Sequence, residues 1–180
     1  MENAEVRISG YRKLPQPDAM LRDIFAVTPE WMAARGLRAL ILDVDNTLAG
    51  YMNRTPDRKV CGHLRELARQ GVLVSIVSNA AQPRVRRFAE ALFPAPDKMP
   101  YIARSGKPRP DALLAMAKQL GVTARETAMV GDQLLTDIAA GRRAGMYTVW
   151  VEPFRNPFLF HVFFRARRRM EARMAKIGKS

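Results

Sequence analysis

Two carboxylates stand directly after an apolar run: Asp43 and Asp45 follow residues 39–42. Asn46 and Thr47 come next and favour a turn. Alternate residues of an extended chain point to opposite faces, so both acids reach one site only if the strand ends between them. Like-charge repulsion would then leave one acid ionised, as a nucleophile or metal ligand, beside one proton carrier. The alternative is that the pair only forms a turn.

A hydroxyl and an amide follow a second apolar run, because Ser78 and Asn79 come directly after residues 72–77. Together with backbone N–H groups at the start of the next helix, these side chains could donate hydrogen bonds to a phosphate group. The competing interpretation is that they only cap that helix.

A lysine and two more acids complete the candidate residues. Lys107 stands in a Gly-Lys-Pro loop, where an ammonium group beside acids would stabilise developing phosphoryl charge; the alternative is a solvated loop lysine. Gly131 lets the backbone come close, and Asp132 at a strand tip suits a Mg²⁺ ligand. Asp137 could bind metal, orient Lys107 or cap a helix.

Alternating apolar patterns predict the elements that must position these residues. Strands are expected at 39–42, 72–77, 101–103, 127–130 and 146–151. Helices are expected at 57–70, 83–92, 113–120 and 134–143, with a short outer helix at 18–26 and a capping box at 123–126. This order favours a doubly wound α/β fold with a parallel sheet of about five strands. Ligands of such sheets bind outside the carboxyl ends of the strands, where all the candidate residues stand.

The connections at those strand ends are short. There is no room for an inserted cap domain in residues 49–56. There is none between residue 78 and the Gly-Lys-Pro loop either, because a helix and a strand already take up most of that span. The cleft is therefore expected to be open to bulky substrates. We expect one domain over residues 1–152 and a separate tail over 153–180.

Composition supports one globular domain with a sizeable core, since 48% of the 180 residues are hydrophobic. The single cysteine, Cys61, excludes an internal disulfide and suits a reducing compartment. A nucleophilic role for Cys61 beside His63 is conceivable, but residues two apart on a helix face apart. A small buried cysteine is the favoured interpretation.

The positive charge is concentrated at the C-terminal end. From Trp150 to Ser180 there are eight Lys or Arg and two Glu, so this segment holds +6 of the net charge of +13. From residue 159 onward, apolar residues recur every three or four positions between arginines, which predicts a basic amphipathic helix. Such a helix could bind an anionic membrane surface, pack on its own domain or in a dimer, or contact RNA, which is less favoured.

Nothing in the sequence indicates secretion or a membrane span. Residues 1–10 are polar and mixed in charge, unlike a secretory signal. No apolar stretch approaches the ~18 residues that a spanning helix needs. We expect a cytoplasmic protein that could rest on the inner face of a membrane.

Four motifs follow four predicted strands in this order: an acid pair, Ser-Asn, Lys-Pro and Gly-Asp-x₄-Asp. Together they resemble the motifs of the haloacid dehalogenase (HAD) superfamily of phosphatases. The resemblance covers residues 14–151. Within the superfamily, the chain most resembles the capless class IIIA group of YqeG-type phosphatases, and this finer resemblance rests on residues 24–29, 130–138 and 145–148. That group is similar to mitochondrial phosphatidylglycerophosphate phosphatases.

The resemblance implies a role for each candidate residue. Asp43 would be the nucleophile that forms an aspartyl-phosphate, and Asp45 the general acid and base. Mg²⁺ would be held by Asp43, the backbone carbonyl of Asp45 and Asp132. Phosphate would be bound by Ser78, Asn79 and Lys107. Asp137 would be a supporting acid.

The expected function is thus Mg²⁺-dependent hydrolysis of a phosphomonoester, with a phosphorylated small molecule or lipid headgroup as partner. Phosphatidylglycerophosphate is the favoured substrate, which would place the protein in phospholipid biosynthesis. A soluble sugar phosphate or nucleotide is an alternative substrate. A factor that binds nucleic acid or the ribosome through the same scaffold is the alternative of another class.

Overall fold

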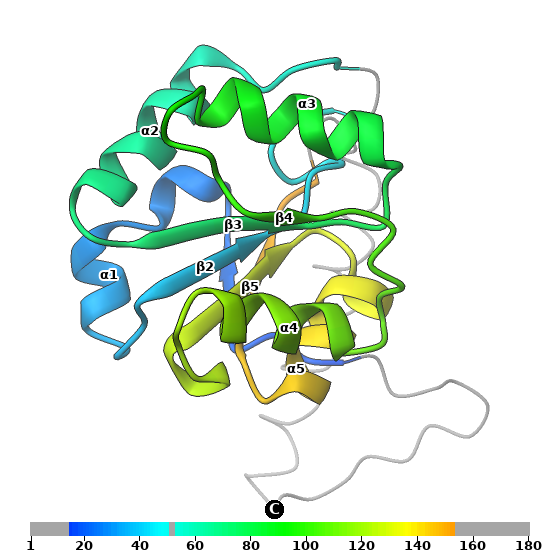
Figure 1. The fold of residues 1–180 in the computed structure, drawn as a ribbon. Helices are drawn as coiled ribbons and strands as arrows, with labels where there is room; N and C mark the ends of the chain where they lie inside the picture. The colour runs from blue at the N-terminus through cyan, green and yellow to red at the C-terminus, as the bar shows by residue number, and fades with distance from the viewer. Residues whose placement is uncertain (1–14, 51–52, 154–180) are drawn as a thin grey trace, which may run out of the picture.

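A computed structural model of the chain describes residues 15–50 and 53–153. Its centre is a six-stranded parallel sheet in the order β1-β6-β5-β2-β3-β4 (Figure 1). The strands are β1 (Ala19–Leu21), β2 (Ala39–Leu42), β3 (Leu73–Val77), β4 (Tyr101–Ile102), β5 (Thr127–Gly131) and β6 (Tyr147–Val151). The predicted parallel α/β architecture is confirmed. The predicted tail helix lies outside the described residues, and the division at residue 152 stays a prediction.

Helical segments cover both faces of this sheet (Figure 1). They are η1 (Ile24–Ala26), α1 (Pro29–Ala33), α2 (Arg58–Arg69), α3 (Gln82–Leu92), α4 (Asp111–Gln119), η2 (Ala124–Glu126), the π-helical turn η3 (Leu134–Ile138) and α5 (Ala139–Ala144). Buried side chains of α1, α2 and α3 form one core cluster with the sheet, and those of α4 and α5 form a second. The sheet is therefore the middle of three layers.

The central strand shows why the sequence folds in this way. All of β2 is buried, as expected of a strand covered on both faces. Leu40 and Leu42 belong to the first core cluster, whereas Ile41 belongs to the second. The period of two along an extended chain thus sends alternate apolar side chains into opposite layers.

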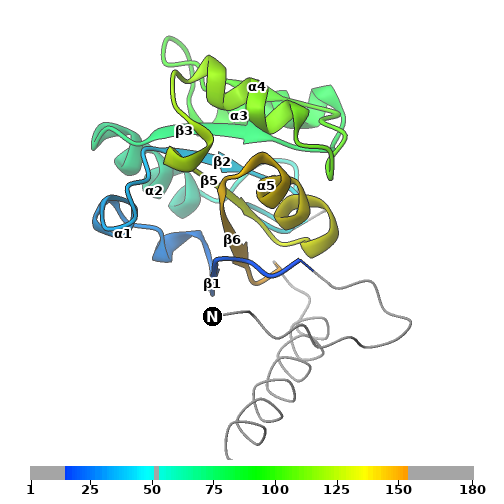
Figure 2. The ribbon, with the colours of Figure 1, turned by 90° about the horizontal axis from the view of Figure 1, so that it is seen from below.

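The prediction of a helix at 18–26 is wrong, and the sheet accordingly has six strands rather than about five. Strand β1 pairs in parallel with β6, at the sheet edge that Figure 2 shows from below. The Asp18 carboxylate accepts hydrogen bonds from the Thr148 N–H (2.8 Å) and hydroxyl (2.7 Å). Only η1 is helical there, capped by Asp23. A distant strand, which local periodicity does not reveal, decides the conformation of this segment.

The helix expected at 134–143 consists of two pieces, η3 and α5. In η3 the N–H of Ile138 donates to the Gln133 carbonyl (3.2 Å), and the Asp137 N–H donates to the same oxygen (2.9 Å). The chain then continues as α5 and ends at Gly145, whose φ of +72° suits a glycine C-cap. The widened turn lies directly after β5 and carries Asp137.

The sheet has a topological switch point at β2. The chain passes from β2 to β3 and β4 on one side, then crosses to β5 and β6 on the other. Loops that leave the carboxyl ends of β2 and β5 therefore diverge at a crevice, where open α/β sheets bind ligands. The short connection between β3 and α3, residues 78–81, holds no inserted domain.

Candidate active site

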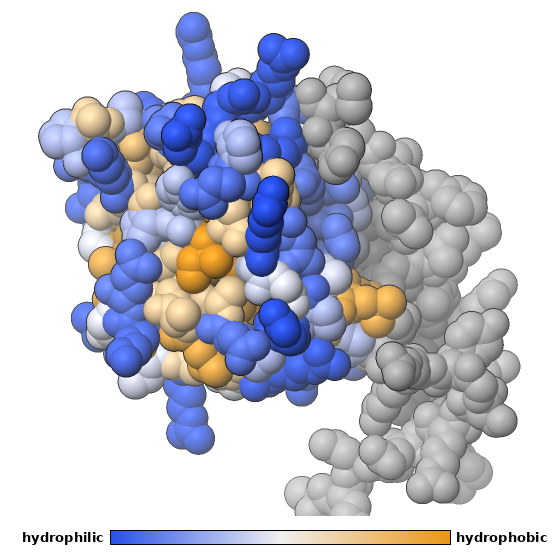
Figure 3. All heavy atoms as spheres, turned by 45° about the vertical axis from the view of Figure 1, so that its right-hand side comes forward, coloured by the Kyte–Doolittle hydropathy of each residue, from blue (hydrophilic) through white to orange (hydrophobic). Residues whose placement is uncertain are grey.

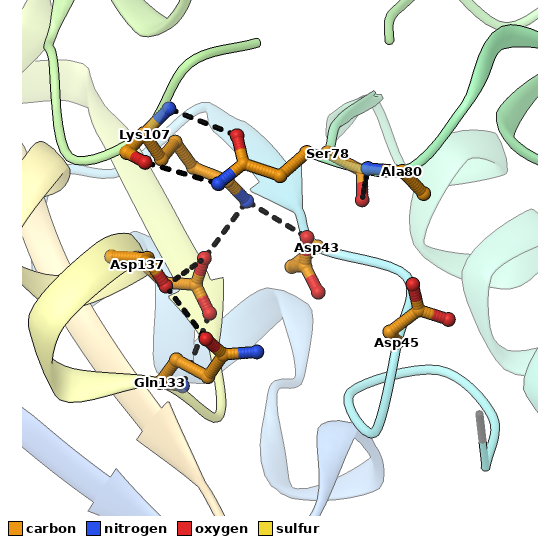
Figure 4. A pocket seen from close by; sticks show the side chains of 9 residues that line it. Asp43, Asp45, Ser78, Ala80, Lys107, Gln133 and Asp137 are labelled. Atoms are coloured by element: carbon orange, nitrogen blue, oxygen red, sulfur yellow. Dashed lines mark hydrogen bonds and ion pairs between the residues drawn. The ribbon is translucent and has the colours of Figure 1, made fainter. Parts of the chain in front are cut away.

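A buried lysine lies at the centre of the crevice. The Lys107 ammonium nitrogen lies 2.8 Å from an oxygen of Asp43 and 2.8 Å from an oxygen of Asp137, and it donates to the Val77 carbonyl (2.7 Å) (Figure 4). All three of its N–H donors can thus be used. Burial alone would lower the pKa of Lys107, but Asp137 and Asp43 together outweigh it and the pKa is raised. Lys107 is a fixed positive charge.

Asn79 holds the loop that carries this lysine. Its side-chain oxygen accepts from the Lys107 N–H (2.9 Å) and the Ser105 hydroxyl (2.8 Å), and its amide nitrogen donates to the Lys107 carbonyl (3.0 Å). The sequence suggested that Asn79 binds phosphate. In the structure its side chain holds the Lys107 loop and also lines the hollow described below, and phosphate binding by Asn79 stays a prediction.

Three carboxylates gather beside the lysine. Asp43, Asp132 and Asp137 each offer an oxygen, and these oxygens lie within 4.8 Å of one another. Asp43 follows β2, Asp132 follows β5, and the side chain of Asp137 packs on the α-carbon of Gly131. A methyl group at Gly131 would lie 2.3 Å from an Asp137 oxygen, so only glycine fits there. Glycine at this strand tip is what lets the three acids meet.

Two residues outside the predicted set orient Asp132. The Trp150 indole N–H donates to the Asp132 carbonyl oxygen (2.6 Å) and the Thr47 hydroxyl lies 3.5 Å from its carboxylate. Burial, then the charges of Asp137 and Asp43, raise the pKa of Asp132 to about 8.

The donor set fits a divalent cation. Mg²⁺ and similar ions prefer hard oxygen ligands, and three clustered carboxylates supply them beside a single lysine. Burial raises the pKa of Asp132, and the nearby charges of Asp137 and Asp43 raise it further, so a cation bound among these oxygens would stabilise the ionised form. Asp43, Asp132 and Asp137 are the side chains that would hold the ion.

Asp45 lies outside this cluster, on another side of the same hollow (Figure 4). Strand β2 ends at Leu42, and Asn46 takes a φ of +60° while its N–H donates to the Ala49 carbonyl (2.8 Å). This turn brings Asp43 and Asp45 to one cavity although they are only two positions apart. The Arg84 side chain holds Asp45, with Nε 2.8 Å from Oδ1.

The hollow itself is small and polar, with a volume of about 70 Å³. It accommodates a few water-sized groups and therefore suits a phosphoryl group rather than a whole substrate. Asp132 does not line it, but six of the seven predicted site residues do. The lining consists of Asp43, Asp45, Ser78, Asn79, Ala80, Lys107, Gln133, Thr136 and Asp137.

Sequence reasoning missed Thr47, Arg84, Gln133 and Trp150. Gln133 donates its backbone N–H to the Asp137 carboxylate (3.1 Å) and lines the hollow. Arg84 and Trp150 reach the site from a helix and a strand whose patterns only indicate burial. No local motif marks such residues, since their contacts are long-range.

Comparison with known proteins identifies the family. The model of the haloacid dehalogenase-like hydrolases matches residues 6–145, more than half of the chain. The chain belongs to this family. The chain is 32% identical to "Probable phosphatase YqeG" of Bacillus subtilis over 79% of its own length and 80% of that protein. With this relative and the acid cluster, the chain is a HAD-type phosphatase, as the sequence resemblance implied.

A second relative is the "Phosphatidylglycerophosphate phosphatase 1, chloroplastic" of Chlamydomonas reinhardtii. It is 30% identical over 80% of this chain, but the chain spans only 55% of its length. Among solved structures, the cobalt-bound deoxy-D-mannose-octulosonate 8-phosphate phosphatase of Haemophilus influenzae superposes with a TM-score of 0.53 at 21% identity. The superposition covers 65% of this chain and 69% of that one, and it supports the HAD fold. None of the helices within residues 15–50 and 53–153 has the length and hydrophobicity of a membrane-spanning segment.

Proposed function

We propose that the protein hydrolyses a phosphomonoester through an aspartyl-phosphate formed on Asp43, with Mg²⁺ as the cation. The observation that carries this proposal is the buried contact of Lys107 with Asp43 in a hollow the size of a phosphoryl group. A carboxylate held next to a fixed cation, with a second carboxylate across the cavity, is the arrangement that nucleophilic attack on phosphorus needs.

The chain's own residues supply both halves of the reaction. A carboxylate oxygen of Asp43 attacks phosphorus, the bond to the leaving oxygen breaks, and Asp45 gives that oxygen its proton. Water then attacks the aspartyl-phosphate, Asp45 takes the proton, and inorganic phosphate leaves with Asp43 restored. Lys107 stabilises negative charge on the transferring group, to which Ser78 offers its hydroxyl. A divalent cation, when bound, offsets further charge on that group.

Phosphatidylglycerophosphate is the substrate we propose. The hollow holds only the phosphoryl group, so the rest of the substrate must lie outside it. Leu135 lies in the chain between Gln133 and Thr136, which line the hollow. It has 60% of its surface exposed, which suits contact with an apolar substrate surface. Figure 3 turns the right-hand side of Figure 1 forward and shows hydrophobic residues among polar ones there. The algal relative at 30% identity is named for this lipid.

A soluble substrate is the second candidate. The "Glyceraldehyde 3-phosphate phosphatase" of Pyrococcus abyssi is 30% identical over 74% of this chain, which spans 55% of that protein. A panel should therefore compare phosphatidylglycerophosphate in vesicles with glyceraldehyde 3-phosphate, other sugar phosphates and nucleotides, with released phosphate as the readout. We expect the lipid to give the highest kcat/KM; a soluble ester at the top of the panel would replace it.

The nucleophile is tested separately by Asp43→Asn. We expect turnover of every substrate to fall to background while the thermal unfolding temperature stays near that of the wild type, since Lys107 keeps its contact with Asp137. Residual activity within tenfold of the wild type would refute the assignment of Asp43.

The basic tail is proposed to bind the anionic inner face of the membrane. Flotation of the full chain with anionic and with neutral vesicles tests this directly, and we expect binding only to the anionic ones. An RNA shift assay across salt tests the competing function, because binding through phosphate contacts weakens steeply with salt. RNA binding with no flotation would favour a nucleic-acid-associated factor.

A further inference from the structure

We propose that Arg84 is a positioning residue that fixes one oxygen of the Asp45 carboxylate and thereby assigns proton transfer to the other oxygen. This inference rests on the proposed hydrolysis through Asp43 and deepens it. Two nitrogens of Arg84 converge on the same atom: Nε lies 2.8 Å and Nη2 lies 2.6 Å from Oδ1 of Asp45. Both contacts join α3 to the loop after β2.

Arg84 is itself held on several sides. Its Nη1 donates to the Asn53 carbonyl (2.8 Å), and its guanidinium carbon lies 5.0 Å from the ring centre of Phe88. Phe88, one turn further along α3, is fully buried, and only 22% of the Arg84 side chain is exposed. A planar guanidinium with its neighbours fixed in this way is a rigid reference for the carboxylate.

Asp45 needs such a reference because the backbone around it is a turn rather than a strand. Its neighbour Asn46 has a φ of +60°, and the backbone of Asp45 forms an isolated bridge with Ala49 outside the named strands. Arg84 contacts this loop at two places, the Asp45 carboxylate and the Asn53 carbonyl. It therefore ties both ends of the turn to the rigid start of α3.

The contacts also decide where the proton resides. Arginine offers only donors, so a proton on Oδ1 of Asp45 would face the Nε–H donor and the adjacent cationic Nη2 of Arg84, with no acceptor. Among the residues that the structure describes, no hydrogen bond uses Oδ2 of Asp45. Oδ2 is then the atom that gives a proton to the leaving oxygen and takes one from the attacking water. Arg84 touches neither substrate nor water in this scheme.

Loss of Arg84 should leave the carboxylate present but badly placed. Misplacement of a catalytic group by about 1 Å costs on the order of 10²-fold in rate. Acid–base catalysis as a whole contributes roughly 10²- to 10⁴-fold. We therefore expect kcat for an alkyl phosphate to fall by ~10- to 100-fold, with KM nearly unchanged.

The experiment compares Arg84→Met with Arg87→Met, which removes the same charge from an exposed position on α3. Each variant is assayed with glycerol 3-phosphate and with 4-nitrophenyl phosphate, whose leaving group needs little protonation. For Arg84→Met we expect the large loss of kcat on the alkyl ester. On the aryl ester we expect a normal burst of nitrophenol followed by slow turnover, because water attack still needs Asp45 as a base. Arg87→Met should behave as the wild type.

A double-mutant cycle with Asp45→Asn gives the sharper measurement. If Arg84 acts through Asp45, adding Arg84→Met to Asp45→Asn should not reduce the burst or turnover rate further. Arg84→Lys, which keeps the charge but replaces the planar fork of nitrogens by a single one, should show the same dependence on leaving group, and it replaces Arg84→Met if that variant does not fold.

Three results would overturn the inference. One is a kcat for Arg84→Met within twofold of Arg87→Met on the alkyl ester. Another is a raised KM with unchanged kcat, which would make Arg84 a substrate-binding residue. The third is an additive loss in the double mutant. Failure of the proposed hydrolysis itself looks different, since the wild type would then release no phosphate or Asp43→Asn would remain active.

Discussion

Lys107 and Asp45 face the same hollow, but their surroundings differ (Figure 4). The ammonium group of Lys107 is buried, with 1% of its side chain exposed, and is fixed by two carboxylates and a carbonyl. Asp45 has 17% of its side chain exposed and depends on Arg84 from a neighbouring helix. The buried side holds opposite charges at fixed places, whereas the more open side can exchange protons with substrate and water.

Removal of the cation should have the largest effect, because the three carboxylates that would hold it gather on the buried side. Chelation of Mg²⁺ should silence hydrolysis of 4-nitrophenyl phosphate. Saturating Mg²⁺ should raise the stability of the metal-free protein, by about 2.7 kcal/mol at 100 times Kd. Thermal unfolding with and without Mg²⁺ measures this shift, which should largely vanish in Asp132→Asn. Metal-independent turnover would rule out the proposed mechanism.

Replacement of the buried lysine should have the second-largest effect. Lys107→Met leaves Asp43 and Asp137 without their partner, and breaking a buried ion pair costs about 3–5 kcal/mol. We expect a lower unfolding free energy by urea titration at pH 7 and activity near background. The loss of stability should shrink at lower pH, because burial raises the pKa of Asp137 and this carboxylate can then take up a proton. Arg87→Met is the matched control, and equal stability of the two variants would contradict the role of Lys107.

Leu135, an exposed residue of η3, should affect only substrates presented on a membrane. Leu135→Gln removes an apolar group that is 60% exposed, so the fold should tolerate it. We expect KM for phosphatidylglycerophosphate in vesicles to rise several-fold, while kcat/KM for 4-nitrophenyl phosphate stays unchanged. Leu114→Gln, on the exposed side of α4 at 44%, is the control. Equal behaviour of both variants on vesicles would remove Leu135 from the substrate surface.

The smallest effect is expected far from the hollow, at Glu126. The Thr123 backbone N–H, then its hydroxyl and Arg38, lower the pKa of Glu126 from 4.5 to about 2. A carboxylate with a lowered pKa stabilises the fold above the unfolded-state pKa, and this contribution is lost as pH falls through the folded-state value. The unfolding temperature of the wild type should therefore approach that of Glu126→Gln between pH 4.5 and 2. A constant difference over this range would contradict the assignment.

Much of the fold was predictable because its signals are local. The apolar run at 39–42 and the runs that became β3, β5 and β6 are buried strands, and the period of the α2 residues marks its core face. The segment at 18–26 could not be predicted, because pairing of β1 with β6 depends on Asp18 meeting Thr148, 130 positions away.

The sequence predicted which residues gather at the site better than it predicted the contacts between them. The motifs at the strand ends named all three acids of the cluster and Lys107, because residue type and strand end are both local facts. The contact of the Asn79 side chain with the loop of Lys107 could not be predicted from the sequence, since it depends on how two loops pack together.

The sequence by itself determined a parallel α/β chain whose charged and polar residues stand at strand ends, since apolar periodicity and turn residues are encoded over a few positions. Only the tertiary structure decided that Arg84 holds Asp45 and that Trp150 orients Asp132. Both are contacts between side chains and groups from separate elements. Their partners are chosen when the layers pack and burial makes an unpaired polar group costly.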